Sequence, residues 1–168
     1  LGRLPGVGSS EDYSALGTLA EGLARLATID LQSSSDTAPA PVDLATLLDE
    51  FRIVMEHSLA NDSIAFEING IEDLPLVAGD HHSLFQVFLN LARNSARAME
   101  AMPRKRLTIR ASADEGNVTV CMTDSGPGVA NPSRLFQAFQ QGADTIGLGL
   151  FISRALVRTC GGDLYYQP

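Results

Sequence analysis

Residues 80–102 predict an amphipathic helix whose apolar face needs a partner layer and whose opposite face carries an unusual polar stripe. Asn90, Asn94 and Arg97 are spaced four and then three residues apart, so they fall within one arc of the helix surface. Asparagine is a poor helix former, because its amide competes for backbone hydrogen bonds. Its neutral carbonyl oxygen suits Mg²⁺, and an arginine one turn on suits phosphate. The stripe indicates either a metal and phosphate site or asparagines that are solvated or cap a neighbouring loop.

A strand predicted over residues 117–123 runs directly into a glycine-rich loop. Asp124 continues the face of the strand that carries Val118, Val120 and Met122, and it ends that apolar face with a carboxylate. A carboxylate in this position can accept a hydrogen bond from an exocyclic amine while apolar side chains cover the ring, which is a way to bind adenine. Gly126 and Gly128 allow the backbone to turn sharply close to a ligand. The alternative is that this segment is an ordinary turn.

A second glycine pair, Gly147-Leu148-Gly149-Leu150, opens a helix that is predicted to run to about Cys160. Glycines at a helix N-terminus expose backbone N–H groups, and the helix dipole favours an anion there. The spacing matches neither a P-loop nor a dinucleotide-binding turn, and taken alone it is weak evidence for a phosphate site.

The remaining pattern divides the chain at a Ser- and Pro-rich linker over residues 33–42. Before it, residues 11–33 predict a helix with a leucine seam that suits packing on another helix, in a second copy or in its own domain. After it, Asp43 begins a helix with the apolar face Leu44, Leu47, Leu48, Phe51 and Val54. Strands are predicted over 63–69 and 106–112, and a short strand begins at Asp163 and reaches Tyr166.

Composition narrows the classes of partner. The chain has 168 residues and a formal net charge of −8, and aromatic residues make up only 6% with no Trp. These values argue against nucleic-acid binding and against direct binding to anionic membranes. Cys121 and Cys160 form no CxxC motif and are expected to be buried small side chains. Because the chain begins with Leu1, we expect it to be a fragment of a longer protein, and any membrane attachment to come from an upstream segment.

Taken together, these motifs resemble the ATP-binding domain of the GHKL superfamily, and within it the catalytic domain of sensor histidine kinases. The resemblance covers about residues 43–166. It rests on four stretches in the family's order, which are residues 79–99 (like the N box), 124–129 (G1 box), 135–139 (F box) and 147–150 (G2 box). It implies an α/β two-layer sandwich in which helices cover one face of a mixed β-sheet. It also implies an ATP lid over residues 129–146, between the N box and the G2 box, with Phe136 and Phe139 anchoring it.

The resemblance assigns roles to individual residues of the expected ATP site. Asn94 would coordinate Mg²⁺, with help from Asn90, and Arg97 would face phosphate. Asp124 would bind the adenine amino group, with Gly126, Gly128 and Val129 shaping the pocket around it. The G2 residues would place backbone N–H groups at the phosphates, and these are Gly147, Leu148 and Gly149.

Three features separate this chain from other members of the superfamily that it resembles. Gyrase- and MutL-like ATPases carry a Glu at the position of Asn90 to activate water, and an asparagine cannot take that proton. The family's G2 box usually reads GTGLGL, and here Thr145 and Ile146 replace its first Gly and its hydroxyl residue. The family also adds one more strand after the point where this chain stops, at Pro168.

The resemblance implies a two-component histidine kinase that transfers the ATP γ-phosphoryl to a histidine and then to the receiver domain of a response regulator. Residues 1–36 would be a linker plus the second helix of a dimerisation hairpin, so we expect a homodimer, and residues 37–168 would be the catalytic domain in the cytoplasm. The phosphoacceptor would lie outside this fragment, since His57, His81 and His82 fall elsewhere and are expected to be solvated. The alternatives are a nucleotide-sensing pseudokinase and an anti-sigma-type serine kinase.

Overall fold

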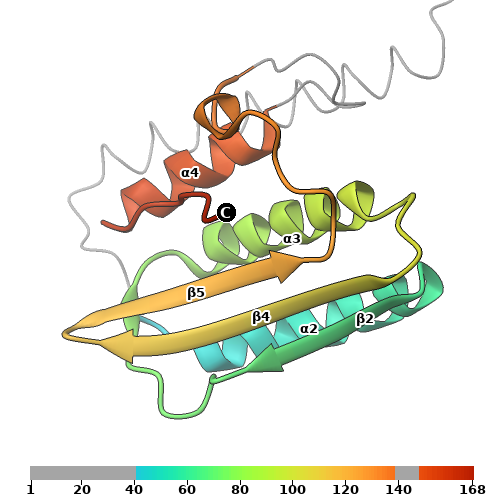
Figure 1. The fold of residues 1–168 in the computed structure, drawn as a ribbon. Helices are drawn as coiled ribbons and strands as arrows, with labels where there is room; N and C mark the ends of the chain where they lie inside the picture. The colour runs from blue at the N-terminus through green and yellow to red at the C-terminus, as the bar shows by residue number, and fades with distance from the viewer. Residues whose placement is uncertain (1–40, 139–147) are drawn as a thin grey trace, which may run out of the picture.

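The computed structural model describes residues 41–138 and 148–168, and these form two layers (Figure 1). One layer is a three-stranded sheet in the order β2-β4-β5, and the other contains the helices that cover one of its faces. The expected α/β sandwich with a mixed sheet is confirmed. The predicted helix at 11–33 and the domain over residues 1–36 lie outside the described residues.

The sheet is mixed because β4 (Lys105–Asp114) pairs with neighbours of opposite direction. It is parallel to β2 (Ile64–Asn69) and antiparallel to β5 (Asn117–Asp124). Leu107, Ile109 and Ala111 alternate toward the helices and are buried, while the residues between them face away. The β4–β5 hairpin closes through Glu115 and Gly116, both at positive φ.

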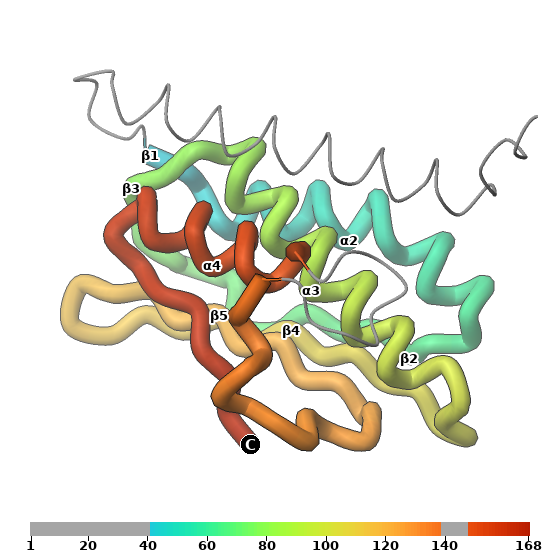
Figure 2. The backbone as a smooth tube through the Cα atoms, turned by 90° about the horizontal axis from the view of Figure 1, so that it is seen from above, coloured from blue at the N-terminus to red at the C-terminus, as the bar shows by residue number. Residues whose placement is uncertain are grey.

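Of the three α-helices within residues 41–138 and 148–168, two begin at the aspartates that the sequence indicates. The side chain of Asp43 accepts hydrogen bonds from the first turn of α2 (Leu44–Asn61), and that of Asp80 accepts from the first turn of α3 (His81–Ala98). The third helix, α4 (Gly149–Thr159), packs against α3 (Figure 2). None of the helices in the described ranges has the length and apolar character needed to span a bilayer.

Helix α3 contributes to two separate hydrophobic clusters. Phe88, Ala92 and Met99 join the main cluster between α2 and the sheet, where Phe51 contacts three other phenylalanine rings. Val87 joins the second cluster, where it packs with Leu148, just before α4, and with Ile152 and Leu156 of α4. Helix α3 is therefore held from two sides, and only a narrow arc of its surface remains for polar groups.

Several predicted element bounds are wrong in informative ways. Val54 is 56% exposed, and Met55 takes its place on the buried face of α2, because that face drifts by one residue after Phe51. Helix α3 ends at Ala98, not near Met102, although both Met99 and Met102 pack in the core. Strand β4 runs from Lys105 to Asp114, longer at both ends than the predicted 106–112.

The predicted linker and the two cysteines also need correction. Pro41 and Val42 form the two-residue strand β1, which pairs antiparallel with β3 (Val77–Ala78). Such short pairings carry no periodicity that a sequence can reveal. Cys121 is exposed on β5 rather than buried, because it alternates with the inward-facing Val120 and Met122, and Cys160 is half-buried.

The predicted strand over Asp163–Tyr166 is absent from the structure. The carboxylate of Asp163 instead accepts hydrogen bonds from Arg154, at 2.8 and 2.9 Å, and from Arg158, at 3.1 and 3.4 Å. It also accepts the N–H of Leu164, a donor that a strand would use in its ladder. These bonds tie the C-terminal segment to α4, from which it runs past β5 (Figure 2).

We predict that Gly70→Ala lowers the free energy of unfolding by roughly 2–4 kcal/mol. Gly70 has φ +72°, and a Cβ there would lie 2.4 Å from the carbonyl oxygen of Ala111 in the neighbouring strand. Gly116→Ala is the matched control, because Gly116 also has positive φ but its Cβ would meet nothing within 4 Å. Urea unfolding should give a loss of roughly 1–2 kcal/mol for this control. Equal losses in both variants would refute the steric argument.

We also predict an acid-dependent contribution from Asp163. Its hydrogen bonds from Arg154 and then Arg158 hold the pKa of this carboxyl well below its usual range. The unfolded chain therefore takes up the proton first, so the stabilisation is complete above about pH 4 and is lost as the pH falls further. Thermal unfolding between pH 7 and pH 2 should show Asp163→Asn less stable than the parent at pH 7, with the difference shrinking below about pH 4.

The control for this prediction is Asp62→Asn. The Asp62 carboxylate makes none of the hydrogen bonds found in the described part of the chain, although its backbone carbonyl accepts one from Lys105. This variant should follow the pH dependence of the parent. A difference between parent and Asp163→Asn that stays constant down to pH 2 would contradict the prediction.

Candidate functional site

Asp124 ends β5, and both of its carboxylate oxygens are hydrogen-bonded within the protein. Oδ2 accepts a hydrogen bond from the Ser95 hydroxyl on α3 at 2.8 Å, and Oδ1 accepts one from the backbone N–H of Gly126 at 2.9 Å. Ser95 is only 8% exposed, whereas Asp124 is half-buried. The carboxylate is therefore fixed between the last strand of the sheet and the last turns of α3.

The glycine-rich loop after β5 packs closely on the end of α3. A Cβ on Gly126 would lie 2.8 Å from Asp124 Oδ1 and 3.2 Å from the Cβ of Ala98. The Ser125 hydroxyl accepts the N–H of Arg106 at 2.9 Å, which ties the loop to the start of β4. Gly128 has φ +78°, a conformation that favours glycine. Gly126 and Gly128 thus need glycine for different reasons, the first for close approach and the second for its backbone conformation.

Asn90 is bound on both sides of its amide. Its Nδ2 donates to the hydroxyl of Ser153 on α4 at 3.3 Å, and its Oδ1 accepts from Gln86 Nε2 at 3.1 Å. Ser153 is fully buried, so this hydrogen bond satisfies a hydroxyl that would otherwise be costly in the α3–α4 contact. Asn90 therefore connects α3 to α4, a contact that the spacing of the polar stripe does not predict.

Asn94 and Arg97 continue the stripe beyond this contact. Asn94 is half-buried, and its amide takes part in none of the hydrogen bonds found among residues 41–138 and 148–168. Arg97 is exposed in the last turn of α3. The structure thus leaves the Asn94 carbonyl oxygen available to a ligand more fully than that of Asn90.

The N-terminus of α4 supplies backbone donors next to this stripe. Leu148 is the N-cap and has no side-chain hydrogen bond to the helix, so the first N–H groups of α4 are not capped by that residue. Gly149 has open space around the position of a Cβ. Gly147, Thr145 and Ile146 lie outside the described residues, and so does the second part of the predicted lid, from Phe139 onward.

The beginning of the predicted lid contacts α4 through Arg154. Its guanidinium lies 5.0 Å from the centroid of the Phe136 ring, and the same guanidinium binds Asp163. Val129 is half-buried, and Arg134 ends the short 3-10 helix Pro132–Arg134. One arginine thus joins the segment after the glycine loop, helix α4 and the C-terminal segment.

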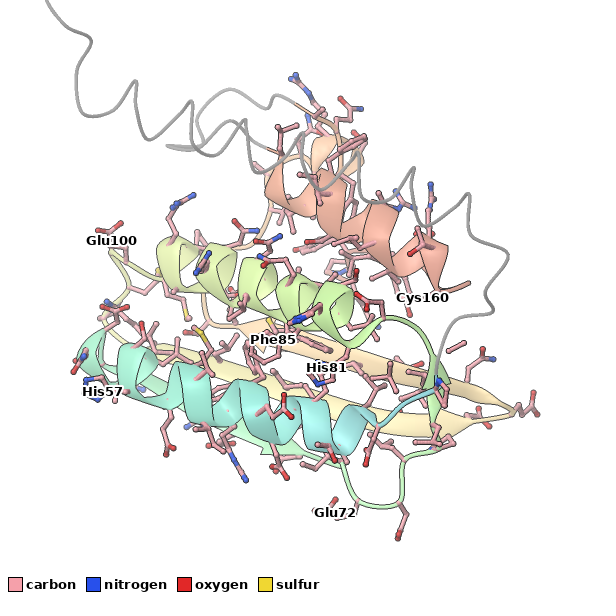
Figure 3. The ribbon with its side chains drawn as sticks, turned by 180° about the vertical axis from the view of Figure 1, so that it is seen from behind. His57, Glu72, His81, Phe85, Glu100 and Cys160 are labelled. Carbon is pink, nitrogen blue, oxygen red and sulfur yellow. The ribbon has the colours of Figure 1, made fainter. Side chains whose placement is uncertain are left out.

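The histidines lie away from these groups, and one of them is not simply solvated. His81 Nε2 lies 3.2 Å from Glu50 Oε2 on α2, and its ring stacks on Phe85 with an interplanar angle of 9°. Figure 3 shows His81 and Phe85 on the side of α3 that faces α2, and His57 near the far end of α2. His57 and His82 are exposed, as expected.

A divalent cation fits this site only if a bound phosphate supplies most of its ligands. The described ranges contain no group of three or more His, Cys, Asp or Glu side chains that could hold a metal ion. The candidate protein ligands are the two asparagine carbonyl oxygens, and hard neutral oxygens of this kind suit Mg²⁺ that keeps waters and phosphate oxygens. The donor set is therefore compatible with Mg²⁺ bound together with a nucleotide.

Sequence reasoning missed the two serines that orient the site. Ser95 and Ser153 are the buried polar side chains of the described core, and each bonds to a residue far away in the chain. The available signal was a serine on the apolar face of a helix, because the hydroxyl of such a serine needs a hydrogen-bond partner when it is buried. Neither partner could be read from spacing along one helix.

Comparisons with known proteins agree with this geometry. Residues 79–168 match the family described as histidine kinase-, DNA gyrase B-, and HSP90-like ATPase. The signal transduction histidine-protein kinase BarA of Escherichia coli is 32% identical over 142 residues, which cover 76% of this chain and 15% of BarA. This chain therefore spans less than a sixth of that curated relative.

Two solved structures are similar to the chain over most of its length. Full-length ShkA in complex with AMPPNP is 29% identical with a TM-score of 0.67, covering 89% of this chain and 34% of that one. The histidine kinase ThkA in complex with the response regulator protein TrrA has a TM-score of 0.65 over 96% of this chain and 49% of that one. At 20% identity, the ThkA likeness shows the fold alone.

The chain belongs to the histidine kinase-, DNA gyrase B-, and HSP90-like ATPase family. Within that family, the curated relative BarA is a signal transduction histidine-protein kinase, and it is similar to 76% of this chain.

We predict that Asn90 and Ser153 are energetically coupled. Each single change, Asn90→Ala or Ser153→Ala, should lower the free energy of unfolding by about 1 kcal/mol, because each leaves a partner unsatisfied. The double variant should lose about 0.5–1 kcal/mol less than the sum of the two. Urea unfolding of the four proteins measures this coupling, and Asn94→Ala is the control from the same stripe with little expected change. Simple additivity of Asn90→Ala and Ser153→Ala would contradict the prediction.

Proposed function

We propose that this domain binds Mg-ATP with its adenine on Asp124 and its phosphates between α3 and the start of α4. It then presents the γ-phosphoryl group to a histidine outside this fragment. The observation that carries the proposal is the Asp124 carboxylate, fixed at the end of β5 by Ser95 and Gly126. A carboxylate accepts hydrogen bonds only, so a fixed one selects a ligand that brings a donor, such as the adenine amino group.

The ring of the adenine would lie against the glycine-rich loop. Gly126 has no side chain between Asp124 and Ala98, so the backbone of the loop stays close to the carboxylate. Gly128 and Val129 follow and complete this side of the site. The described contacts leave Oδ1 and Oδ2 with one protein hydrogen bond each, and an ionised carboxylate offers about four acceptor positions.

The phosphates would meet neutral, cationic and backbone groups in turn. Asn94 would hold the Mg²⁺ through its carbonyl oxygen, with Asn90 as a weaker second ligand since Gln86 already donates to its Oδ1. The bound Mg²⁺ supplies charge neutralisation to the phosphates. Arg97 would add a positive charge, and the N–H groups of Gly147, Leu148 and Gly149 would bind phosphate oxygens at the N-terminus of α4.

The transfer step needs little covalent chemistry from this chain. A ring nitrogen of the acceptor histidine attacks the γ-phosphorus, the bond to the β–γ bridging oxygen breaks, ADP leaves, and the imidazole loses its N–H proton to solvent. Asn90 stands where an ATP hydrolase would need a base, and an amide cannot accept the proton of water. The site therefore holds ATP for a protein nucleophile rather than for hydrolysis.

The phosphoryl group would pass next to an aspartate of a response regulator receiver domain. ThkA, a neighbour in fold, has been solved with such a partner, which supports this proposal by analogy. The phosphoacceptor histidine would be carried by the hairpin whose second helix we expect within residues 1–36. Pairing of two such hairpins would make the parent protein a homodimer.

We predict that calorimetric titration of this chain with ATP detects binding that depends on Asp124 and Mg²⁺. Asp124→Asn should weaken ATP binding by about tenfold or more, because its amide N–H₂ can face the adenine amino group. Asn94→Ala should retain ATP binding but lose most of its dependence on Mg²⁺. Asp114→Asn, in the distant β4–β5 hairpin, is the control and should match the parent. Unchanged ATP binding in Asp124→Asn would refute the proposed adenine contact.

The same variants test the transfer step in the longer parent protein. With γ-labelled ATP, the longer protein without substitutions should acquire phosphate that is labile in acid and stable in base, and the same protein with Asp124→Asn should not. Acid-stable phosphate on a partner serine would contradict histidine as the acceptor.

A further inference from the structure

The hydrogen bond between Ser95 and Asp124 joins residues 29 positions apart, from the last turns of α3 to the end of β5. The Ser95 hydroxyl donates to Oδ2 at 2.8 Å, and the direction is fixed because a carboxylate can only accept. A serine within a helix commonly bonds to a backbone carbonyl one turn earlier instead. Only 8% of Ser95 is exposed, so its hydroxyl is kept from water and its hydrogen bond goes to the carboxylate.

The two hydrogen bonds on Asp124 together determine the orientation of its carboxylate. Gly126 donates to Oδ1 from the loop, and Ser95 donates to Oδ2 from α3, so rotation about the last side-chain bond would break both. Gly126 alone lies two residues away and moves with the loop. Of these two contacts, only the one from Ser95 fixes the carboxylate relative to another secondary-structure element, helix α3.

We propose that Ser95 is a positioning residue that sets the selectivity of this site for 6-aminopurine over 6-oxopurine nucleotides. The proposal rests on the proposed role of Asp124 as the acceptor for the adenine amino group. A carboxylate held in one orientation meets that amine with a free acceptor position and meets a 6-oxo group with electrostatic repulsion. A carboxylate that can rotate loses both the gain and the penalty, so discrimination falls.

The test compares ATP with inosine triphosphate, which differs at purine position 6, by calorimetric titration of the 168-residue chain. Ser95→Ala should bind ATP about fivefold more weakly and ITP within about twofold of the parent, so the ATP-to-ITP affinity ratio falls. Ser95→Thr keeps a hydroxyl and should retain the parent ratio within about twofold. Urea unfolding of each variant checks that it is folded.

Ser153→Ala is the matched control, because it removes the other buried hydroxyl of the core, which bonds to Asn90 and not to Asp124. Its ATP-to-ITP ratio should equal that of the parent. In the Asp124→Asn background, Ser95→Ala should change the ratio by less than about twofold, because the two residues act through one contact.

The outcomes distinguish the positioning role of Ser95 from the adenine contact of Asp124. If Asp124→Asn leaves the ATP-to-ITP ratio unchanged, the adenine contact itself is wrong. If Asp124→Asn lowers the ratio but Ser95→Ala does not, Asp124 reads the base without help from Ser95 and the positioning proposal alone is overturned. A ratio that falls as far in Ser95→Thr as in Ser95→Ala also overturns it, since side-chain volume rather than the hydroxyl would then matter.

Discussion

Helix α3 packs against two partners at once, and this packing determines which polar side chains of α3 need a hydrogen-bond partner inside the protein. Phe88, Ala92 and Met99 face the main core, while Val87 faces α4. A polar side chain that is buried between these layers is destabilising unless it has a hydrogen-bond partner. Asn90, beside the α4 contact, therefore bonds to Ser153, and Ser95, next to the main core, bonds to Asp124. The site is the set of polar groups that this two-sided packing tolerates.

Sequence periodicity was sufficient where one element alone determines the outcome. Asp43 and Asp80 cap helices through their own side chains, and the alternation ending in Asp124 follows from the pleat of one strand. It failed where a distant partner decides. The segment from Asp163 is predicted as a strand, but the Asp163 carboxylate accepts hydrogen bonds from two arginines of α4 and from the N–H of Leu164. The sequence predicts a solvated His81, but its ring stacks on Phe85 and one of its nitrogens lies beside the Glu50 carboxylate.

The same limit applies within the site. Spacing placed Asn90, Asn94 and Arg97 on one arc and could not tell how each is surrounded, whereas the structure gives them different surroundings. Asn90 is engaged by α4 and Gln86, Asn94 is half-buried, and Arg97 is exposed. A ligand between α3 and α4 would have to compete with Ser153 for the amide of Asn90, but it would meet the carbonyl of Asn94 without competition from the described residues. The two asparagines are therefore unequal ligands although they lie on the same arc of α3.

This inequality bears on how the domain could hold ATP without hydrolysing it. The amide of Asn90 has no proton-accepting function, and its hydrogen bond to the buried Ser153 keeps it directed at α4. Helix α4 also carries Arg154, which contacts Phe136 at the start of the predicted lid and Asp163 in the C-terminal segment. A change in the position of α4 would thus be felt at Asn90, Phe136 and Asp163 together. In the proposed function, Asn90 therefore acts less through its own chemistry than by fixing the position of α3 relative to α4.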